Sequence, residues 1–308
     1  MSAASQERET VLQALSNNLA AAIDRAAQSV VAVHARPRIP SSGVLWRPGV
    51  VVTAAHTIRK DGEVTITLPD GGSATATAAG RDRPTDVAVF KLNQSGGSSA
   101  EFAASSAKIG QIVLQVGRTG TAGPSASFGV VSAILTGWRT WHGADIDQIL
   151  ELDLSIHDGF SGSALVDAGG RVLGLNTSGL ARGAPLALPA LVVDRIVDTL
   201  LTKGRVGRGY LGVGLQPVDL PPSLSTNPAL EQGRGLMVLS VDPSSPAGSG
   251  GVLLGDVILR VGGVTVTDVR DVFAALSPER VGSSVDVEVL RGGSLVRLRT
   301  TIVERPPR

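Results

Sequence analysis

The sequence predicts a mainly β protein: two small barrels side by side, followed by a smaller module of mixed α and β structure. Between residues 29 and 189, roughly eleven short strand-like runs follow one another with no helical pattern between them. Turn-forming stretches such as Pro69-Asp70-Gly71-Gly72 and Gly169-Gly170 separate several of these runs. Many short strands without intervening helices suggest a sandwich or barrels, and this number suits two barrels. After residue 209 the strands mix with a short helix, which indicates a separate module.

Residues 1–28 are expected to form an N-terminal helix, because apolar side chains recur at helical spacing between residues 7 and 28. The apolar stripe, expected to lie on the body of the protein or on another subunit, consists of Val11, Leu12, Leu15, Leu19 and Ile23. The barrels should occupy residues 29–203. Their predicted strands are 29–35, 43–52, 63–68, 73–79, 86–92, 111–116, 126–135, 148–153, 164–167, 171–176 and 185–189.

The Gly- and Ser-rich stretch Gln94–Ala104 is the predicted connection between the barrels. A helix over Leu191–Thr202 should follow the second barrel and end at Gly204. The next residues, Gly204–Gly209, have the composition of a linker. The last module should span residues 209–304. Its predicted elements are strands over Tyr210–Gln216, Leu236–Val241, Asp256–Val261, Val285–Leu290 and Ser294–Val303, and a helix over Asp268–Leu276.

Composition narrows the possible functions. The 308 residues include 28 Lys and Arg and 27 Asp and Glu, a net charge of +1, so nothing favours nucleic acid or an anionic membrane surface. The absence of cysteine excludes disulfides and thiol chemistry. No apolar run approaches the ~20 residues of a membrane span. Because the first residues lack a signal-peptide pattern, the chain as it stands is expected to be cytoplasmic, or periplasmic or otherwise extracytoplasmic if a leader was removed.

Three short stretches contain the candidate catalytic residues. VVTAAH ends at His56, TDVAV contains Asp86, and GFSGSA contains Ser161. Each lies where a β-rich chain turns a corner, and His, Asp, Ser is one of the known orders among serine hydrolases. Taken singly, such a histidine, aspartate or Gly-x-Ser-Gly turn is more often structural. Their joint occurrence in this order predicts a peptidase.

The three side chains have complementary roles in this chemistry. A serine hydroxyl is a poor nucleophile at neutral pH, so Ser161 needs a base within hydrogen-bond reach. His56 is the predicted base, and Asp86 would hold its far nitrogen and stabilise the imidazolium as it forms. The backbone N–H groups of Gly159 and Ser161 are the predicted oxyanion hole, because a glycine lets the backbone approach the developing charge without a Cβ in the way.

These residues and their surroundings closely resemble the HtrA (high-temperature-requirement, or Deg) family of serine proteases. That family typically reads T-N-x-H-V, T-D-L-A-V-L-K and G-N-S-G-G-P-L at the three positions. The matching stretches here are TAAHT (53–57), TDVAVFK (85–91) and GFSGSAL (159–165), with further agreement at GVVSAI (129–134) and GLNT (174–177). The resemblance covers about residues 20–300. It implies a chymotrypsin-like double barrel, cleavage of unfolded or damaged polypeptides in protein quality control, and a homotrimer.

Three residues around the nucleophile depart from the family pattern. Phe160 stands in place of a polar residue, and Ser163 and Ala164 replace Gly and Pro. These changes leave the triad intact but are expected to affect how the oxyanion loop settles. In chymotrypsin-like folds the floor of the specificity pocket lies a few residues before the nucleophile, which is Ser155 here. Asn176 and Ser178 belong to one wall. Because no carboxylate stands at the floor, we expect small or medium apolar side chains (Val, Ala, Leu) before the scissile bond.

The last module resembles a bacterial PDZ domain. The resemblance rests on YLGV (210–213), GLMV (235–238) and the GVLLGDVI run (251–258). Backbone N–H groups of the YLGV turn can hold a chain-terminal carboxylate while the peptide adds as a strand to the edge of the sheet. The residues predicted to bind the peptide are Tyr210, Leu211, Gly212, Val213, Phe273 and Leu276. Val269 and Val272 would join the last two in an apolar pocket, and about half of these apolar side chains are expected to be core instead.

We therefore predict a serine endopeptidase whose PDZ domain binds peptide segments or C-termini, with no cofactor and no metal. Its partners should be unfolded polypeptides and PDZ ligands, and no nucleic acid. His34, His142 and His157 show no metal-ligand spacing. One alternative is an HtrA-like holdase that no longer cleaves. Another is an adaptor whose PDZ domain recruits a partner, with proteolysis incidental.

Overall fold

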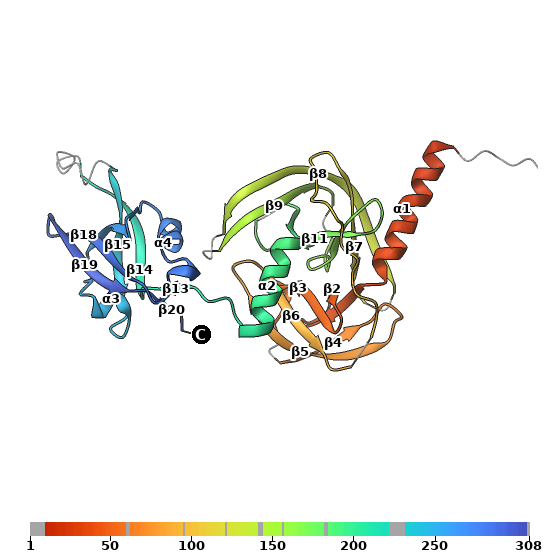
Figure 1. Cartoon of the computed structure of the whole chain (residues 1–308), viewed down its shortest axis with the longest axis horizontal. Helices are drawn as coiled ribbons and strands as arrows, with labels where there is room; N and C mark the ends of the chain where they lie inside the picture. The colour runs from red at the N-terminus through yellow and green to blue at the C-terminus, as the bar shows by residue number, and fades with distance from the viewer. Residues whose placement is uncertain are drawn as a thin grey trace, which may run out of the picture. The chain divides into compact units, whose positions relative to one another are not determined.

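The computed structural model describes residues 10–59, 62–94, 96–120, 122–140, 144–155, 157–181, 184–221 and 232–306. The chain forms two compact units, divided between Val206 and Gly207. The first unit contains two closed barrels with helices α1 (Val11–Ala27) and α2 (Ala190–Lys203), and the second contains an open sheet with short helices (Figure 1). The predicted fold class, two barrels followed by a smaller α+β module, is confirmed.

The first barrel closes in the order β1-β2-β3-β6-β5-β4. Its strands are β1 (Val30–His34), β2 (Ser41–Arg47), β3 (Val50–Ala54), β4 (Glu63–Thr67), β5 (Ser73–Asp82) and β6 (Val87–Leu92). Because side chains alternate between the two faces of a strand, Val31 and Val33 pack in one core cluster and Val30 in another. The stretch 43–52, predicted as one strand, belongs to the β2–β3 hairpin, since Gly49 with its φ of +70° turns the chain.

The second barrel closes in the order β10-β11-β12-β9-β8-β7. Its strands are β7 (Ile112–Arg118), β8 (Pro124–Arg139), β9 (Asp145–Asp153), β10 (Ala164–Asp167), β11 (Val172–Thr177) and β12 (Leu186–Pro189). Leu150 and Leu165 pack in a cluster of this barrel alone. A further cluster joins Val44 of the first barrel with Leu114 of the second and Val197 of α2, so burial of apolar side chains holds the two barrels together.

The two long helices of the first unit cover this shared core. In α1, Ala22, Ala26 and Ala27 are buried, whereas Leu12 is 77% exposed. The predicted apolar stripe therefore packs within the chain only at its C-terminal end, where Leu19 and Ile23 contact the core, and residues 7–9 of the predicted helix lie outside the described residues. Helix α2 ends at Gly204, as predicted, and the glycine adopts a left-handed conformation with φ of +71°.

The second unit contains a sheet in the order β14-β15-β16-β18-β19, with β17 paired to β16, and a separate pairing of β13 with β20. Its elements are β13 (Gly209–Tyr210), β14 (Val213–Asp219), β15 (Arg234–Val241), α3 (Pro246–Ser249), β16 (Val257–Val261), β17 (Val264–Thr265), α4 (Val269–Ala275), a 3₁₀ helix η4 (Pro278–Arg280), β18 (Ser284–Arg291), β19 (Ser294–Thr301) and β20 (Val303–Glu304). Strand β14 lies at an edge of this sheet. The sequence did not predict β17 or α3, because two- and four-residue elements carry no measurable periodicity.

Candidate active site

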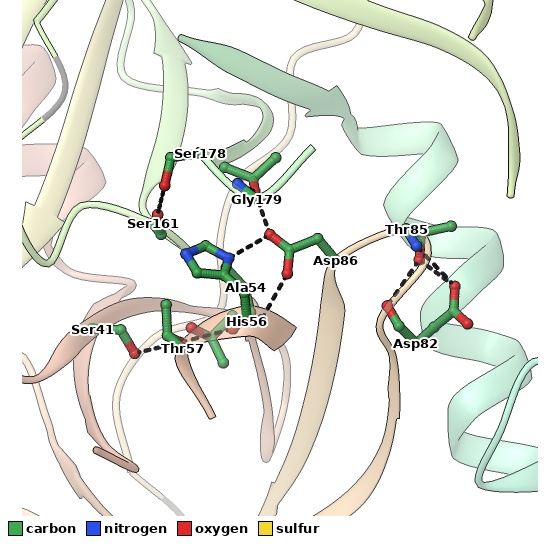
Figure 2. A network of polar contacts seen from close by, with 12 residues as sticks. Ser41, Ala54, His56, Thr57, Asp82, Thr85, Asp86, Ser161, Ser178 and Gly179 are labelled. Carbon is green, nitrogen blue, oxygen red and sulfur yellow. Dashed lines mark hydrogen bonds and ion pairs between the residues drawn. The ribbon is translucent and has the colours of Figure 1, made fainter. Parts of the chain in front are cut away.

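His56 lies in the 3₁₀ helix η1 (Ala55–Thr57), which follows β3 directly. The Thr57 hydroxyl donates to the carbonyl of Ala54 at 2.7 Å and ties this turn to the end of the strand. The His56 ring is partly exposed, and its Nδ1 lies 2.7 Å from Oδ2 of Asp86 (Figure 2). The turn therefore presents the imidazole at the end of the first barrel with one nitrogen already engaged.

Asp86 is held in an unusual backbone conformation before β6. Its φ is +61°, in the left-handed region that few residues other than glycine, Asn and Asp adopt. The preceding turn is fixed by Asp82, whose Oδ2 accepts hydrogen bonds from the Thr85 N–H at 3.2 Å and the Thr85 hydroxyl at 2.6 Å. Asp86 is only 2% exposed. Its Oδ1 accepts from the His56 N–H at 2.7 Å, and its Oδ2 accepts from the His56 ring and the Thr177 hydroxyl.

These contacts explain how a buried carboxylate can be tolerated. A buried carboxylate is stable only when its oxygens accept hydrogen bonds, and both oxygens of Asp86 do so. Thr177 comes from β11 of the second barrel, so the carboxylate also joins the two barrels. The backbone of Gly179 lies against this pair, and only glycine fits there. A Cβ at this position would lie 2.4 Å from Asp86 Oδ2 and 2.6 Å from His56 Nδ1.

Ser161 sits in the turn before β10, and its flanking glycines are required by space. Gly162 has φ of +87°, and a Cβ there would lie 2.3 Å from the carbonyl oxygen of Ser42. Gly159 has φ of +88°, and its Cβ would lie 2.4 Å from Cγ2 of Thr119. The sequence therefore folds this loop against both barrels with Ser161 almost buried, 8% exposed.

The Ser161 hydroxyl is paired with a second hydroxyl rather than with the imidazole. Its Oγ lies 2.9 Å from Oγ of Ser178, just beyond β11. In Figure 2 the second ring nitrogen of His56 points toward Ser161, but no hydrogen bond joins these two described residues. His56 and Asp86 from the first barrel and Ser161 from the second are thus brought to one place.

The predicted oxyanion donors are free of protein partners within the described chain. The carbonyl of Gly159 accepts from the N–H and the hydroxyl of Ser42, at 2.8 and 2.9 Å. In the same loop the Phe160 N–H donates to His157 and the Gly162 N–H donates to Asn176. The N–H groups of Gly159 and Ser161 donate to no other described residue.

A narrow cavity, with no room for a water-sized sphere in this arrangement, lies beside Ser161. The residues that line it are Gln115, Leu154, Phe160, Ser161, Asn176, Thr177, Ser178, Pro185 and Leu186. Asn176 and Ser178, predicted for the specificity pocket, are among them. Ser155, the predicted floor, is not; its carbonyl accepts from the Ser127 hydroxyl at 3.2 Å. Gln115 was not predicted from the sequence, although a polar residue inside the apolar run IVLQVG (112–117) is a usable signal.

Two of the departures from the family pattern have local partners. Phe160 is buried beside His157, their ring centroids 5.4 Å apart, in space that Gly117 leaves free. Ser163 is fully buried, and its Oγ accepts from Gln115 Nε2 and Asn176 Nδ2, each at 3.1 Å. Both side chains are therefore packed or hydrogen-bonded within the first unit.

In the second unit, the predicted carboxylate-binding residues form a loop between β13 and β14. Tyr210 ends β13, Leu211 is buried, Gly212 has φ of +81°, and Val213 begins β14. Within the described residues, the N–H groups of Leu211 and Gly212 donate no hydrogen bond. The loop therefore presents unpaired donors beside an edge strand.

The two helix residues predicted to bind a peptide differ in their surroundings. Phe273 is half-buried and lies outside the core cluster of this unit, whereas Leu276 is 6% exposed and belongs to that cluster. The carbonyl of Leu276 also accepts from the Gly209 N–H at 3.1 Å. Phe273 is thus the better placed of the two to contact a ligand.

The described residues also bear on metal binding and on membranes. No cluster of three or more His, Asp or Glu side chains there has the arrangement of a metal site, and His142 lies outside those residues. None of the described helices combines the length and the apolar character needed to cross a bilayer.

Two six-stranded barrels that bring a His–Asp pair from one barrel and a serine from the other to one place define the trypsin-like class of serine peptidases. A family model described as a trypsin-like peptidase domain matches residues 41–175. A second, described as a PDZ domain, matches residues 209–302.

Comparison with curated proteins identifies the family. The chain is 30% identical over 307 residues to the serine endoprotease DegS of Escherichia coli (strain K12), a match that covers 92% of this chain and 85% of that protein. It is 32% identical over 280 residues to a probable periplasmic DegP-like serine endoprotease of Chlamydia pneumoniae, covering 89% of this chain and 57% of that protein. The chain belongs to the HtrA/Deg family of serine proteases. It spans just over half the length of its DegP-like relatives.

Solved structures agree with this assignment. The HtrA-type protease AlgW with a decapeptide superimposes with a TM-score of 0.71 at 27% identity, covering 94% of this chain and 99% of that one. The serine endoprotease from Yersinia pestis gives a TM-score of 0.71 at 28% identity, covering 94% of this chain and 98% of that one.

Proposed function

We propose that this chain is a serine endopeptidase in which Ser161 is the nucleophile, His56 the general base and Asp86 the residue that orients the base. The observation that carries the proposal is the buried Asp86 carboxylate, which accepts hydrogen bonds from both the backbone and the ring of His56. A carboxylate at Nδ1 favours the tautomer with the proton on that nitrogen, so Nε2 is left free to accept the Ser161 proton.

In the proposed reaction, Ser161 Oγ attacks the scissile carbonyl carbon while His56 Nε2 takes the hydroxyl proton. The carbonyl oxygen becomes an oxyanion, which the N–H groups of Gly159 and Ser161 stabilise. His56 then gives its proton to the leaving amine, and the C–N bond breaks to leave an ester on Ser161. A water molecule, deprotonated by the same imidazole, hydrolyses this ester and restores the hydroxyl.

Because the Ser161 hydroxyl contacts Ser178 instead of His56, we interpret this structure as a resting arrangement of the site. For attack, the Ser161 hydroxyl must exchange its 2.9 Å contact with Ser178 for one with His56 Nε2. Ser161 and Ser178 both line the cavity, and rotation about the Ser161 side-chain bond is the movement we propose for this exchange.

We propose unfolded or damaged polypeptides as substrates, because an extended segment is what both units can hold. In the second unit, the free N–H groups of Leu211 and Gly212 would bind a terminal carboxylate, and the ligand would pair with edge strand β14. The half-buried Phe273 on α4 would contact its last side chain.

Hydrolysis of β-casein, which has little stable structure, tests the proposal. We expect the wild type and Ser125→Ala, a change at an exposed serine of the same barrel, to release peptides at equal rates. Ser161→Ala should release none. Equal peptide release by wild type and Ser161→Ala would contradict the proposal. An inactive wild type that still prevents aggregation of an unfolded protein would support the holdase instead.

We further propose that the chain assembles as a homotrimer. The family resemblance implies this assembly, and the exposed apolar side chains Val11 and Leu12 of α1 and Phe128 of β8 are candidates for burial against another copy. Light scattering on the purified protein should give three times the mass of one chain, and a monomer at micromolar concentration would contradict this.

We consider two compartments for this protein, the cytoplasm and the periplasm, and propose the second. The DegP-like relatives are described as periplasmic, and this favours the second location. Fractionation of cells that express the full-length gene distinguishes the two: an osmotic-shock fraction should contain the protein, and retention in the cytosol would contradict this location.

A further inference from the structure

The loop between β1 and β2 is fixed beside the turn that holds His56. At the start of this loop, the carbonyl of Ala35 accepts a hydrogen bond at 2.9 Å from the N–H of Arg59, three residues beyond His56. At its end, the hydroxyl oxygens of Ser41 and Thr57 lie 3.0 Å apart (Figure 2). Both ends of the loop are therefore tied to the segment that carries the candidate base.

The same loop also lies against the turn before Ser161. The N–H and the hydroxyl of Ser42, directly after the loop, donate to the Gly159 carbonyl at 2.8 and 2.9 Å. The carbonyl oxygen of Pro40 lies only 2.9 Å from the place where a Cβ of Gly159 would be. The loop between β1 and β2 therefore borders the candidate base and the predicted oxyanion hole together.

Three arginines lie on these segments of the first barrel. Arg36 is half-buried, and its Nε donates to the Ile39 carbonyl at 2.7 Å, whereas Arg38 and Arg59 are exposed. None of the three forms an ion pair with another residue that the structure describes, and this holds for the oxyanion-loop carboxylate of Asp158 as well. Like charges gathered without counter-charges create a potential that attracts a ligand of the opposite sign.

Arg38 has an unfavourable backbone conformation. Its φ is +72°, and among the described residues the only other non-glycine position with a positive φ is Asp86, with +61°. Such a conformation costs free energy in a residue other than glycine, Asn or Asp, and residues of this kind cluster at functional sites. Arg38 thus shares an uncommon feature with the candidate triad, and this points to a role of the loop in function.

The chemistry indicates which part of a substrate meets these arginines. In the proposed reaction His56 gives its proton to the leaving amine, so this nitrogen must lie beside the imidazole of the first barrel. The residues after the scissile bond continue from that nitrogen. The predicted pocket for the residue before the bond, with Asn176 and Ser178, belongs to the second barrel. The two halves of a substrate therefore face different barrels.

We propose that this chain prefers polypeptides with Asp or Glu in the first few residues after the scissile bond, and that Arg36, Arg38 and Arg59 bind these carboxylates. The inference rests on the proposed peptidase function. A guanidinium presents N–H donors in a planar fork that matches a carboxylate. Because Arg38 and Arg59 are exposed, a substrate side chain can reach them without displacing a protein partner. The three arginines are then specificity-determining residues.

The test is a competition between two peptides with Val before the scissile bond and either Glu or Gln at the second and third residues after it. Glu and Gln have nearly the same shape, so the pair isolates charge from size. Both peptides are cleaved in one mixture by the full-length protein, and mass spectrometry identifies the bond that is cut. We expect kcat/KM to be higher for the Glu peptide by about threefold to tenfold in ~0.1 M salt, since exposed ion pairs are individually weak. In ~1 M salt the ratio should fall toward one, because charges are screened within about 3 Å.

The double variant with Arg38→Gln and Arg59→Gln should bring the Glu-to-Gln ratio close to one. Arg171→Gln is the matched control, because it removes the same charge from an exposed position beyond the end of β10 that is far from Ser161 in the strand, and it should keep the wild-type ratio.

A wild-type ratio of one or below would overturn the inference and leave the peptidase function in place, whatever the folding of the variants. A double variant that keeps the full wild-type ratio would overturn the assignment to these arginines. If neither peptide is cleaved and a fluorophosphonate fails to label Ser161, the proposed function itself is overturned, and this inference with it.

Discussion

The candidate sites of the two units are built from different groups, side chains in the first unit and backbone in the second. In the first, side chains remote in sequence meet around one buried carboxylate, so that Asp86 accepts hydrogen bonds from His56 and Thr177. In the second, the candidate site is made of backbone: the N–H groups of Leu211 and Gly212, which donate to no other described residue, and the edge strand β14. The first site should therefore respond to the loss of a single side-chain atom, and the second to changes that alter the backbone.

The largest effect should come from Asp86→Asn. Asn also tolerates the left-handed φ of +61° at this position, so the backbone should remain as it is. The carboxylate that fixes the His56 tautomer is lost, and the analogous change in another serine protease lowers kcat by about 10⁴. Peptide hydrolysis measures it. Asp147→Asn, which removes an exposed partner of Arg195 from the same unit, should retain wild-type activity. A loss below tenfold in Asp86→Asn would contradict the role proposed for Asp86.

The next largest effect should be on stability, and confined to the second unit. Asp256 is buried, and Arg291 donates to its two oxygens, each at 2.8 Å. Arg291→Ala leaves that carboxylate without its partner and should destabilise the unit by about 2–3 kcal/mol, discounted for the partial exposure of Arg291. Arg297→Ala, at an exposed pair with Glu288, should change stability by about 0–1 kcal/mol. Calorimetry should show only the second unit's transition moving.

The same ion pair predicts a pH dependence. Burial opposes the charged form of Asp256, but hydrogen bonds from Arg291 and the Leu253 N–H outweigh it, so the pKa of Asp256 is lowered. A carboxyl whose pKa is lower in the folded state stabilises the fold above its unfolded pKa and loses that contribution as the pH falls through its folded pKa. The second unit should therefore lose stability on acidification below about pH 4. In Arg291→Ala this acid loss should be smaller.

A smaller effect should come from Gly212→Ala, which tests the backbone site. A Cβ at this position would lie 2.1 Å from Cβ of Ser245, so the loop must shift. Gly251→Ala is the matched control, because it has the same φ of +81° but its nearest neighbour is 3.9 Å away. With a fluorescent decapeptide that ends in Val, Gly212→Ala should weaken binding by about tenfold, through loss of aligned N–H donors. Gly251→Ala should bind as the wild type does. Equal affinities for a peptide acid and its amide would contradict carboxylate recognition.

The smallest effect should come from Ser178→Ala. Removing the hydroxyl that pairs with Ser161 frees the nucleophile for His56, and a single hydrogen bond of this kind corresponds to about a 2- to 10-fold change. Labelling by a fluorophosphonate should accelerate by that factor. Ser178→Thr, which keeps the hydroxyl, should label at the wild-type rate. Slower labelling of Ser178→Ala would show that the contact assists the reaction instead of restraining it.

Much of the fold could be predicted because its strands are short, regular and separated by recognisable turns. The local sequences around His56, Asp86 and Ser161 are weak evidence when taken singly, and it was their joint occurrence in this order that predicted the site. The contacts of Asp86 with Thr177 and of Ser161 with Ser178 could not be predicted, since they depend on where the end of β11 packs against the first barrel and against the loop before β10. No local pattern encodes such a long-range pairing.

The role of side chains within a correctly predicted element was also hard to predict. Helix α1 exists as expected, but its buried face is formed by Ala22 and Ala26, because small side chains let the helix approach the barrels closely. Leu276 lies on the predicted helix segment yet packs in the core. Periodicity gives the apolar face of a helix, whereas the extent of burial depends on what packs against it.

Mapping the site of fluorophosphonate attachment by mass spectrometry tests the central claim most directly. We expect one adduct per chain, on Ser161, which disappears when His56 is replaced by Ala even though the hydroxyl remains. Attachment to Ser163 or Ser178, or labelling of Ser161 that does not depend on His56, would contradict the assembly of a working nucleophile from two barrels.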